Sequence, residues 1–155
     1  MAIDRETLLF FDASCLIAAA GSPSGGSAFI LLQCERQLLR AAVSDPVCDE
    51  AERNVRAKLR PEAMAIFRGL LRMPGLQVIP EPTEEELARA RGLVETKDEH
   101  VLAAALAAGA AFVITLDKAL QEGIAQAKLP IAAITPGMFI RTMLTQHPDY
   151  PTMRK

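Results

Sequence analysis

The stretch KDEHVLAAALAAGAAFVITLDKAL, residues 97–120, decides the fold class because it joins a helix to a buried strand. Its alanine-rich part predicts a helix over 98–108, and Gly109 is the residue that commonly follows a helix end. Residues 112–115 form a short apolar run, which is typical of a strand buried on both faces. Asp117 then opens a second helical pattern. The stretch therefore predicts a helix–strand–helix unit of a parallel sheet.

The same alternation continues on both sides of this stretch. Further strands are predicted at 8–11, 41–43, 76–79 and 131–134, and further helices at 14–20, 28–39, 45–59, 61–72, 83–94 and 136–144. Strands that alternate with helices indicate a parallel sheet covered on both faces. We therefore expect an α/β fold of three layers, α/β/α, around a central, mainly parallel sheet of four to five strands. We expect one domain over residues 1–155, with its core at about 7–135 and a C-terminal helix and polar tail at 136–155. The end of that tail, which is polar and holds two prolines, is expected to be loosely held.

Composition limits the class of protein. Half of the 155 residues are hydrophobic, so the chain can bury a core without disulfide or zinc staples. No apolar run is long enough for a membrane helix, and the charged N-terminus does not resemble a signal peptide. Three scattered cysteines without motif spacing indicate a reducing compartment, so we expect a cytoplasmic protein that does not contact a membrane. The formal net charge of −2 neither indicates nor excludes a nucleic-acid partner.

Aspartates follow two strands that we expect to be central. Asp12 comes directly after the 8–11 run, and Asp117 follows the 112–115 run. Ligands of open parallel sheets bind beyond the carboxyl ends of the strands, so both carboxylates are expected at one edge. Each of them, like Asp98, would also serve as the cap of the helix that follows, which contributes about 1 kcal/mol. Capping does not explain why acids gather, since crowded carboxylates repel unless a cation offsets their charge. Carboxylates without paired histidine or cysteine suit Mg²⁺ or Mn²⁺ better than zinc.

More acids lie on the helix predicted from residue 45. Asp45 is interpreted as the cap of that helix, and Asp49 as the partner of Arg53 in an i, i+4 pair on a solvated face. Periodicity alone leaves open whether Glu50 or Glu52 points inward.

Three stretches of the sequence together resemble the PIN domain, the small α/β nuclease fold of bacterial VapC-type toxins. FFDAS, residues 10–14, resembles the first strand of that family with its acid. VSDPVCDE, residues 43–50, resembles a serine-led segment whose helix carries an acid six residues later, and this selects Glu50. The block at 97–120 resembles the most recognisable motif of the family, with acids at Asp98 and Asp117.

The resemblance implies an endoribonuclease that uses Mg²⁺ or Mn²⁺ to cleave RNA, as the toxin component of a toxin–antitoxin system. Its catalytic and metal-binding residues would be Asp12, Glu50, Asp98 and Asp117. A cognate antitoxin and a homodimer are implied in the same way. We expect an inhibitor of such a site to insert a basic side chain among the acids.

Other residues are expected to support that site. The hydroxyls of Ser14 and Thr115 would orient carboxylates, and the basic run RNVRAKLR, residues 53–60, would contact a phosphate backbone. Asp12→Asn and Asp117→Asn are expected to abolish cleavage and to keep or raise the thermal midpoint without metal, because repulsion between carboxylates is relieved.

Two alternatives compete with the nuclease. One is a receiver domain that accepts phosphate on an aspartate, although the first strand ends in the single acid Asp12 and no central strand ends in a phosphoacceptor. The other is a catalytically silent PIN fold that binds RNA or protein. The presence of all four acids argues against the silent module.

Overall fold

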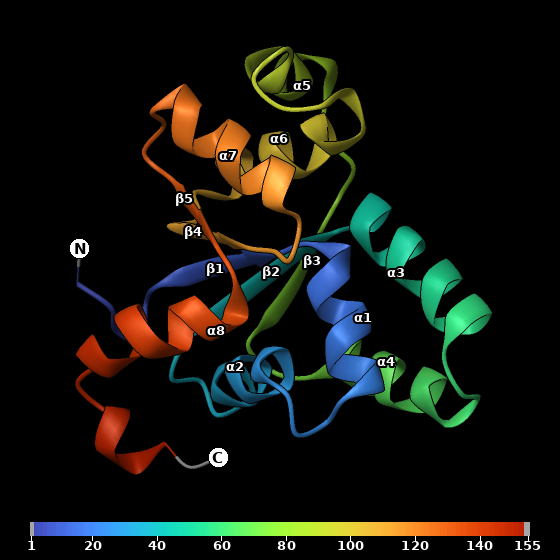
Figure 1. Ribbon diagram of the computed structural model, residues 1–155, viewed down its shortest axis with the longest axis vertical. Helices are drawn as coiled ribbons and strands as arrows, with labels where there is room; N and C mark the ends of the chain where they lie inside the picture. Colours follow the sequence, from blue (N-terminus) through green and yellow to red (C-terminus); the bar gives the residue numbers. More distant parts are fainter. Residues whose placement is uncertain (1, 154–155) are drawn as a thin grey trace.

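A five-stranded sheet forms the centre of the computed structural model, which describes residues 2–153 (Figure 1). Its strands are β1 (Leu8–Phe11), β2 (Arg40–Ser44), β3 (Leu76–Ile79), β4 (Phe112–Ile114) and β5 (Ala132–Ile134). Their order is β3-β2-β1-β4-β5, and every neighbouring pair is parallel. The expected α/β architecture is confirmed. The receiver alternative is wrong, because doubly wound receiver domains have the strand order 2-1-3-4-5.

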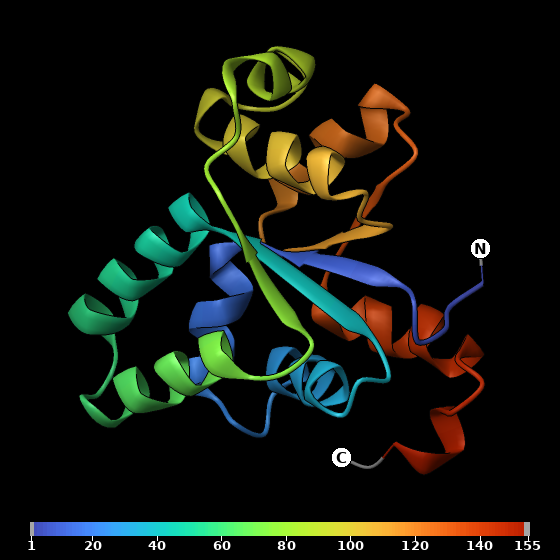
Figure 2. The same ribbon diagram turned by 180° about the vertical axis from the view of Figure 1, so that it is seen from behind.

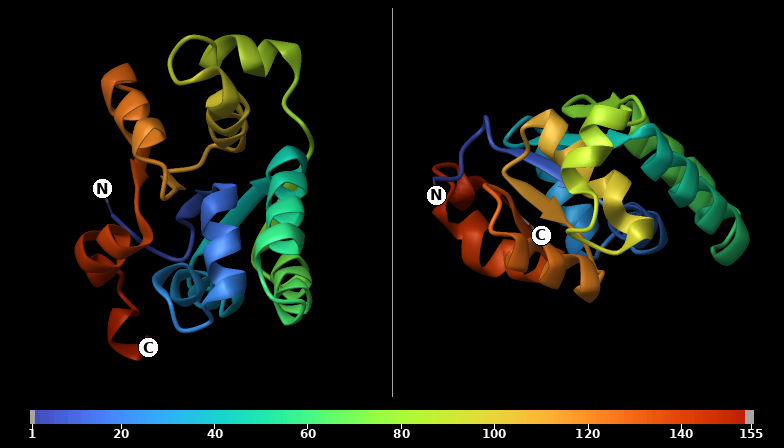
Figure 3. Two further views of the ribbon diagram at one scale, coloured as in Figure 1. Left: turned by 45° about the vertical axis from the view of Figure 1, so that its right-hand side comes forward. Right: turned by 90° about the horizontal axis from the view of Figure 1, so that it is seen from above.

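Helices cover both faces of the sheet, as Figures 1 and 2 show from opposite sides. One group follows β1 and β2 along the chain: α1 (Ala13–Gly21), α2 (Gly26–Glu35), α3 (Asp45–Lys58) and α4 (Glu62–Arg72). The other group follows β3 and β4: α5 (Glu84–Ala90), the 3-10 turn η1 (Thr96–Asp98), α6 (Glu99–Ala108) and α7 (Lys118–Ala127). Figure 3 shows the two groups from two further directions. The topology therefore brings the carboxyl ends of β1 and β4 together between the starts of α1 and α7.

Burial explains why these segments form strands. Leu9, Phe10 and Phe11 in β1 are fully buried, as expected for a central strand with helices on both faces. Phe112 of β4 packs edge to face against Phe139, with ring centroids 5.4 Å apart. Gly109 ends α6 in the left-handed conformation, with φ of 71°, which is the helix end predicted from the sequence.

Several predicted helix ends are wrong. The predicted helix at 28–39 ends at Glu35, because the chain turns through Gln37 with a φ of 62°. The helix predicted to reach residue 94 ends at Ala90, two residues before Gly92 takes a φ of 81°. The helix predicted at 136–144 is divided into α8 (Pro136–Met138), the π-helix η2 (Phe139–Met143) and the 3-10 turn η3 (Leu144–Gln146).

The expectation of a loosely held tail is wrong for residues 147–153. The ring of His147 is buried, with Nε2 2.6 Å from the carbonyl oxygen of Leu38. Its Nδ1 accepts a hydrogen bond of 2.9 Å from the Asp149 N–H, and Asp149 pairs with Arg5 at 2.9 Å. A short turn, η4 (Tyr150–Thr152), follows. One buried histidine thus anchors a segment that composition alone describes as polar.

Within residues 2–153, no single helix is long and apolar enough to cross a membrane. The pair α1 and α2 reaches that length and composition together, with a bend of 97° between them.

Candidate functional site

The first two acids lie at the carboxyl ends of neighbouring strands. β1 pairs with β4 so that Phe11 lies opposite Ile114, and the Asp12 N–H donates to the Ile114 carbonyl oxygen at 3.0 Å. Asp117 lies three residues beyond Ile114, at the start of α7. The sequence-based expectation that Asp12 and Asp117 share one edge of the sheet is confirmed.

Two hydroxyl groups hold the buried carboxylate of Asp12. Its Oδ1 accepts from the Ala13 N–H at 2.8 Å, while its Oδ2 accepts from the hydroxyls of Thr115 at 2.7 Å and Ser14 at 3.2 Å. The same hydroxyls accept hydrogen bonds from the turn after β4: Thr115 from the Asp117 N–H at 3.0 Å, and Ser14 from the Leu116 N–H at 3.1 Å. The expected contact of both hydroxyls with a carboxylate is confirmed, and it ties Asp12 to the segment that carries Asp117.

The third acid, Asp98, occupies the position before α6 without capping it. Its side chain accepts no hydrogen bond from the first turn of that helix, and it is buried. Burial raises the pKa of Asp98, and the charges of Asp117 and Asp12 raise it further against the opposing effect of Lys97. The three aspartates therefore form one electrostatic group, although they come from three separate segments.

Lys97 lies between two of these acids, a contact that the sequence analysis missed. Its Nζ is 2.9 Å from Oδ2 of Asp117, and 3.1 and 3.2 Å from the two carboxylate oxygens of Asp98. Oδ1 of Asp117 accepts from the Leu120 N–H at 3.2 Å. The ammonium lowers the pKa of Asp117, and the two carboxylates raise the pKa of Lys97 above its ordinary value. The only signal in the sequence was a lysine directly before an acid of the 97–120 block.

Glu50 lies on α3, and no hydrogen bond or ion pair among the described residues joins it to this group. It is half-buried, and within residues 2–153 its side chain makes no hydrogen bond or ion pair. The interpretation of Asp45 as a cap is wrong, because Ser44 caps α3 by accepting from the Val47 N–H at 3.4 Å. The structure thus brings together Asp12, Asp98 and Asp117, and leaves Glu50 as an acid on the neighbouring helix.

The surface of α3 also differs from the pairing expected for it. Arg56 pairs with Glu52 at 3.2 Å, and no Asp49–Arg53 ion pair forms among the described residues. The remaining basic side chains of the 53–60 run, together with Arg68 and Arg72 on α4, are exposed. They are available to a polyanion on α3 and α4, two helices that lie away from α6 and α7 (Figure 1).

The donors at the strand ends suit a hard divalent cation. The three aspartates offer only oxygen ligands, as Mg²⁺ and Mn²⁺ prefer. Oxygens from two of them already converge on one positive charge, the Lys97 ammonium. Within residues 2–153, no three Asp, Glu, His or Cys side chains lie close enough to ligate one ion as they stand. The residues therefore fit such an ion by chemistry and location, but not by their present spacing.

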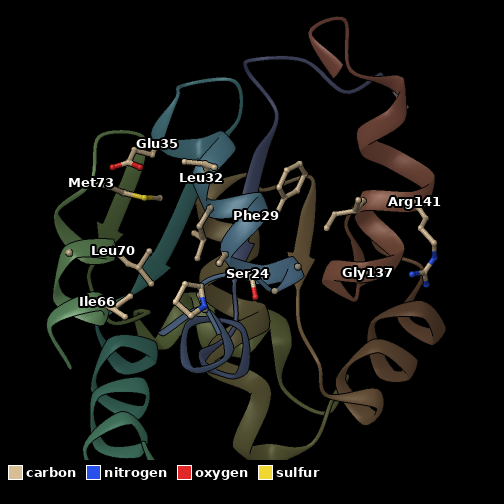
Figure 4. Close-up of a pocket in the computed structure, with 17 residues that line it drawn as sticks. Ser24, Phe29, Leu32, Glu35, Ile66, Leu70, Met73, Gly137 and Arg141 are labelled. Atoms are coloured by element: carbon tan, nitrogen blue, oxygen red, sulfur yellow. The ribbon is translucent and has the colours of Figure 1, made fainter. Parts of the chain in front are cut away.

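A second feature lies on the other side of the molecule from α6 and α7. An apolar groove of about 800 Å³ lies between α2, α4 and the segment after β5. Figure 4 shows Phe29, Leu32, Ile66 and Leu70 along it, with Glu35 and Arg141 at opposite sides. None of the four predicted site residues lines this groove.

Comparisons with known proteins place this fold in a family. A family model described as a PIN domain matches residues 9–119. The crystal structure of VapC20 from Mycobacterium tuberculosis, a toxin that cleaves the sarcin–ricin loop, matches with a TM-score of 0.56 and 11% identity. The alignment covers 79% of this chain and 98% of that one.

A second structure, VapBC2 from Rickettsia felis bound to a DNA fragment from its promoter, matches with a TM-score of 0.63 and 12% identity. It covers 83% of this chain and 98% of the matched chain. A search of curated proteins gives no match. Because the family model spans more than half of the sequence, from β1 into the start of α7, the chain belongs to the PIN domain family.

Proposed function

We propose that this protein is a Mg²⁺- or Mn²⁺-dependent endoribonuclease that cleaves RNA phosphodiester bonds as the toxin component of a toxin–antitoxin system. The observation that carries the proposal is the meeting of Asp12, Asp98 and Asp117 from three segments, with two of them sharing one cation. Membership of the PIN family supports a nuclease, and the RNA-cleaving activity named for VapC20 supports RNA as the substrate class.

The proposed roles follow from the contacts of each side chain. Asp12, Asp98 and Asp117 would hold the ion, with Glu50 as a further ligand or as a base acting through water. When bound, the ion lowers the pKa of a coordinated water and offsets negative charge on the phosphate. Ser14 and Thr115 fix the orientation of Asp12, as hydrogen-bonding partners of ligating carboxylates commonly do. The Leu120 N–H fixes Asp117 in the same way.

The exposed basic side chains of α3 and α4 would bind the RNA backbone at a distance from the acids. Their contribution is electrostatic, so we expect RNA affinity to fall as salt concentration rises. Arg53→Gln combined with Arg60→Gln should reduce that salt dependence, while Mn²⁺ binding at the acids stays unchanged.

We propose that the apolar groove receives the antitoxin. A homodimer interface requires a surface complementary to itself, and a concave apolar groove facing its own copy leaves a void. A convex apolar helix with an acid and a base placed to meet Arg141 and Glu35 would fill it. Gly69 lines the groove, and a Cβ atom added there meets no atom within 4 Å, so we expect Gly69→Arg to be tolerated while its long side chain obstructs the groove.

Co-expression with a small neighbouring open reading frame tests this assignment. Gly69→Arg should abolish co-purification, and Ala57→Arg, at an exposed position of α3, should not. Equal co-purification of both variants would overturn the assignment. The homodimer remains a separate proposal, which light scattering of the isolated chain tests. The three cysteines are free thiols, which supports our proposal that the protein works in the cytoplasm.

Cleavage of a mixed RNA pool with and without Mn²⁺ tests the nuclease. Asp12→Asn and Asp117→Asn should each abolish cleavage. Glu50→Gln should reduce it, whereas Asp49→Asn, an exposed acid on the same helix, should not. Cleavage unchanged in Asp12→Asn and Asp117→Asn would remove the metal-site proposal.

A second candidate is a PIN fold that binds RNA without cleaving it. It is favoured by the finding that no three candidate ligands in the described residues lie close enough for one ion. RNA binding by the wild-type chain without cleavage at any Mn²⁺ concentration would support this candidate over the nuclease.

A further inference from the structure

The ammonium group of Lys97 occupies a central position among the aspartates. It contacts Oδ2 of Asp117 and both carboxylate oxygens of Asp98, and it lies 3.9 Å from Oε2 of Glu95. Among residues 2–153, no other basic side chain forms an ion pair with Asp12, Asp98 or Asp117. The positive charge inside this site therefore comes from the chain itself.

We propose that Lys97 is a built-in counter-ion of the site, which a divalent cation must displace, so that metal binding there is an exchange of cations. The inference rests on the proposed function, because it takes Asp98 and Asp117 as ligands of the ion. A Mg²⁺ ion lies about 2.1 Å from its oxygen ligands. An ion bound to the oxygens that Lys97 contacts would therefore lie against the ammonium, and two neighbouring cations repel strongly.

The burial of the three side chains shows which partner can leave. The Lys97 side chain is 62% exposed, whereas those of Asp98 and Asp117 are 9% and 27% exposed. Lysine carries a strongly hydrated charge on a flexible stem, so the displaced ammonium can turn into water without desolvation. Asp98 and Asp117 cannot leave the site in this way, because Asp98 is buried and Asp117 accepts a hydrogen bond from the Leu120 N–H.

The exchange of Lys97 for a metal ion has two consequences that metal binding to an empty site would not have. Without metal, Lys97 relieves repulsion between Asp98 and Asp117, so it stabilises the fold. With metal, the same contacts must be broken, so Lys97 weakens metal binding. Removing its charge should therefore move stability and metal affinity in opposite directions.

Calorimetric titration with MnCl₂ and thermal melting in EDTA test the exchange on the full chain. Lys97→Met removes the charge and keeps the length, and Lys97→Arg keeps the charge. Lys118→Met is the matched control, since Lys118 is an exposed lysine next to Asp117 that forms no ion pair among the described residues. We expect Lys97→Met to bind Mn²⁺ about three- to tenfold more tightly than wild type, as the loss of one or two exposed ion pairs predicts. In EDTA it should melt below wild type, and Lys118→Met should not.

The outcomes separate this inference from the proposed function. If wild type binds Mn²⁺ and Asp12→Asn does not, but Lys97→Met binds no more tightly than Lys118→Met, the exchange is overturned and the metal site stands. If Lys97→Met loses Mn²⁺ binding, Lys97 supports the site, and the exchange is again overturned. If neither wild type nor any variant binds Mn²⁺, the proposed function fails, and the exchange fails with it.

Discussion

Replacing Thr115 by valine tests whether one hydroxyl joins two acids of the site. Thr115 is fully buried at the end of β4. Its hydroxyl donates to Asp12 at 2.7 Å and accepts from the Asp117 N–H at 3.0 Å. Valine keeps the branched shape and removes both hydrogen bonds. Asp12 Oδ2 then retains only the longer bond from Ser14, at 3.2 Å.

The expected loss of stability follows from the two hydrogen bonds. A hydrogen bond to a charged group contributes about 1.5–3 kcal/mol, and a buried donor left without a partner costs about 1–3 kcal/mol. The Asp117 N–H is only partly buried, so the lower end applies to it. We expect Thr115→Val to lower the free energy of unfolding by about 2–4 kcal/mol, which is a fall of roughly 5–12 °C in the thermal midpoint.

Urea unfolding of a double-mutant cycle is the decisive assay. Thr115→Ser, which keeps the hydroxyl and loses one methyl group, should cost about 1 kcal/mol. Thr115→Val and Asp12→Asn should be non-additive by about 1 kcal/mol or more, since the first removes the donor of this bond and the second removes the charge of its acceptor. Additivity within about 0.5 kcal/mol, or a Thr115→Val variant no less stable than Thr115→Ser, would refute the role given to this hydroxyl.

Other predictions concern charge, thiols and the tail. The pKa of Asp98 is raised in the folded protein, so ionisation of this carboxyl lowers stability as pH rises above the ordinary aspartate pKa of about 3.9. Asp98→Asn should therefore melt at or above wild type near pH 7. The pKa of Asp117 is lowered in the folded protein, so its ionised carboxylate stabilises the fold above the ordinary aspartate pKa. This stabilisation is lost as pH falls through the pKa of the folded state. Asp117→Asn should therefore lower stability by about 0.5–1 kcal/mol at pH 7 in urea titrations, contrary to the expectation from the sequence. Burial raises the pKa of Cys15 to about 12, so this thiol should react with iodoacetamide at pH 8 only after denaturation. His147→Ala should cost about 2–4 kcal/mol in urea unfolding, because it removes a buried ring and two hydrogen bonds.

The 97–120 block was predictable because its signals are local. Alanine-rich periodicity defines the body of α6, and Gly109 takes the left-handed conformation that ends it. The apolar run 112–114 is β4, and its pairing with β1 brings the two following aspartates together. Local pattern and sheet topology are therefore sufficient to predict that Asp12 and Asp117 share one edge.

The contacts that the sequence did not predict depend on distant residues. Lys97 reaches Asp117 across 20 positions, and His147 reaches Leu38 across 109. Both contacts form only when distant segments pack together, so neither periodicity nor capping rules can predict them. The cap of α3 was missed for a smaller reason. Asp45, interpreted as the cap, is the first residue of α3 and Pro46 the second, so the cap is Ser44.

Capping and a role in the site are compatible for Asp12 and Asp117, as their hydrogen bonds show. Asp12 and Asp117 each use Oδ1 for the N–H groups of the following helix, and Oδ2 for side chains of the site. The positive end of a helix dipole favours a carboxylate at the same position. Caps at the starts of α1 and α7 thus hold two charged groups at one edge of the sheet, where repulsion would otherwise separate them. Asp98 caps nothing through its side chain, and among the described residues its carboxylate accepts hydrogen bonds only from Lys97.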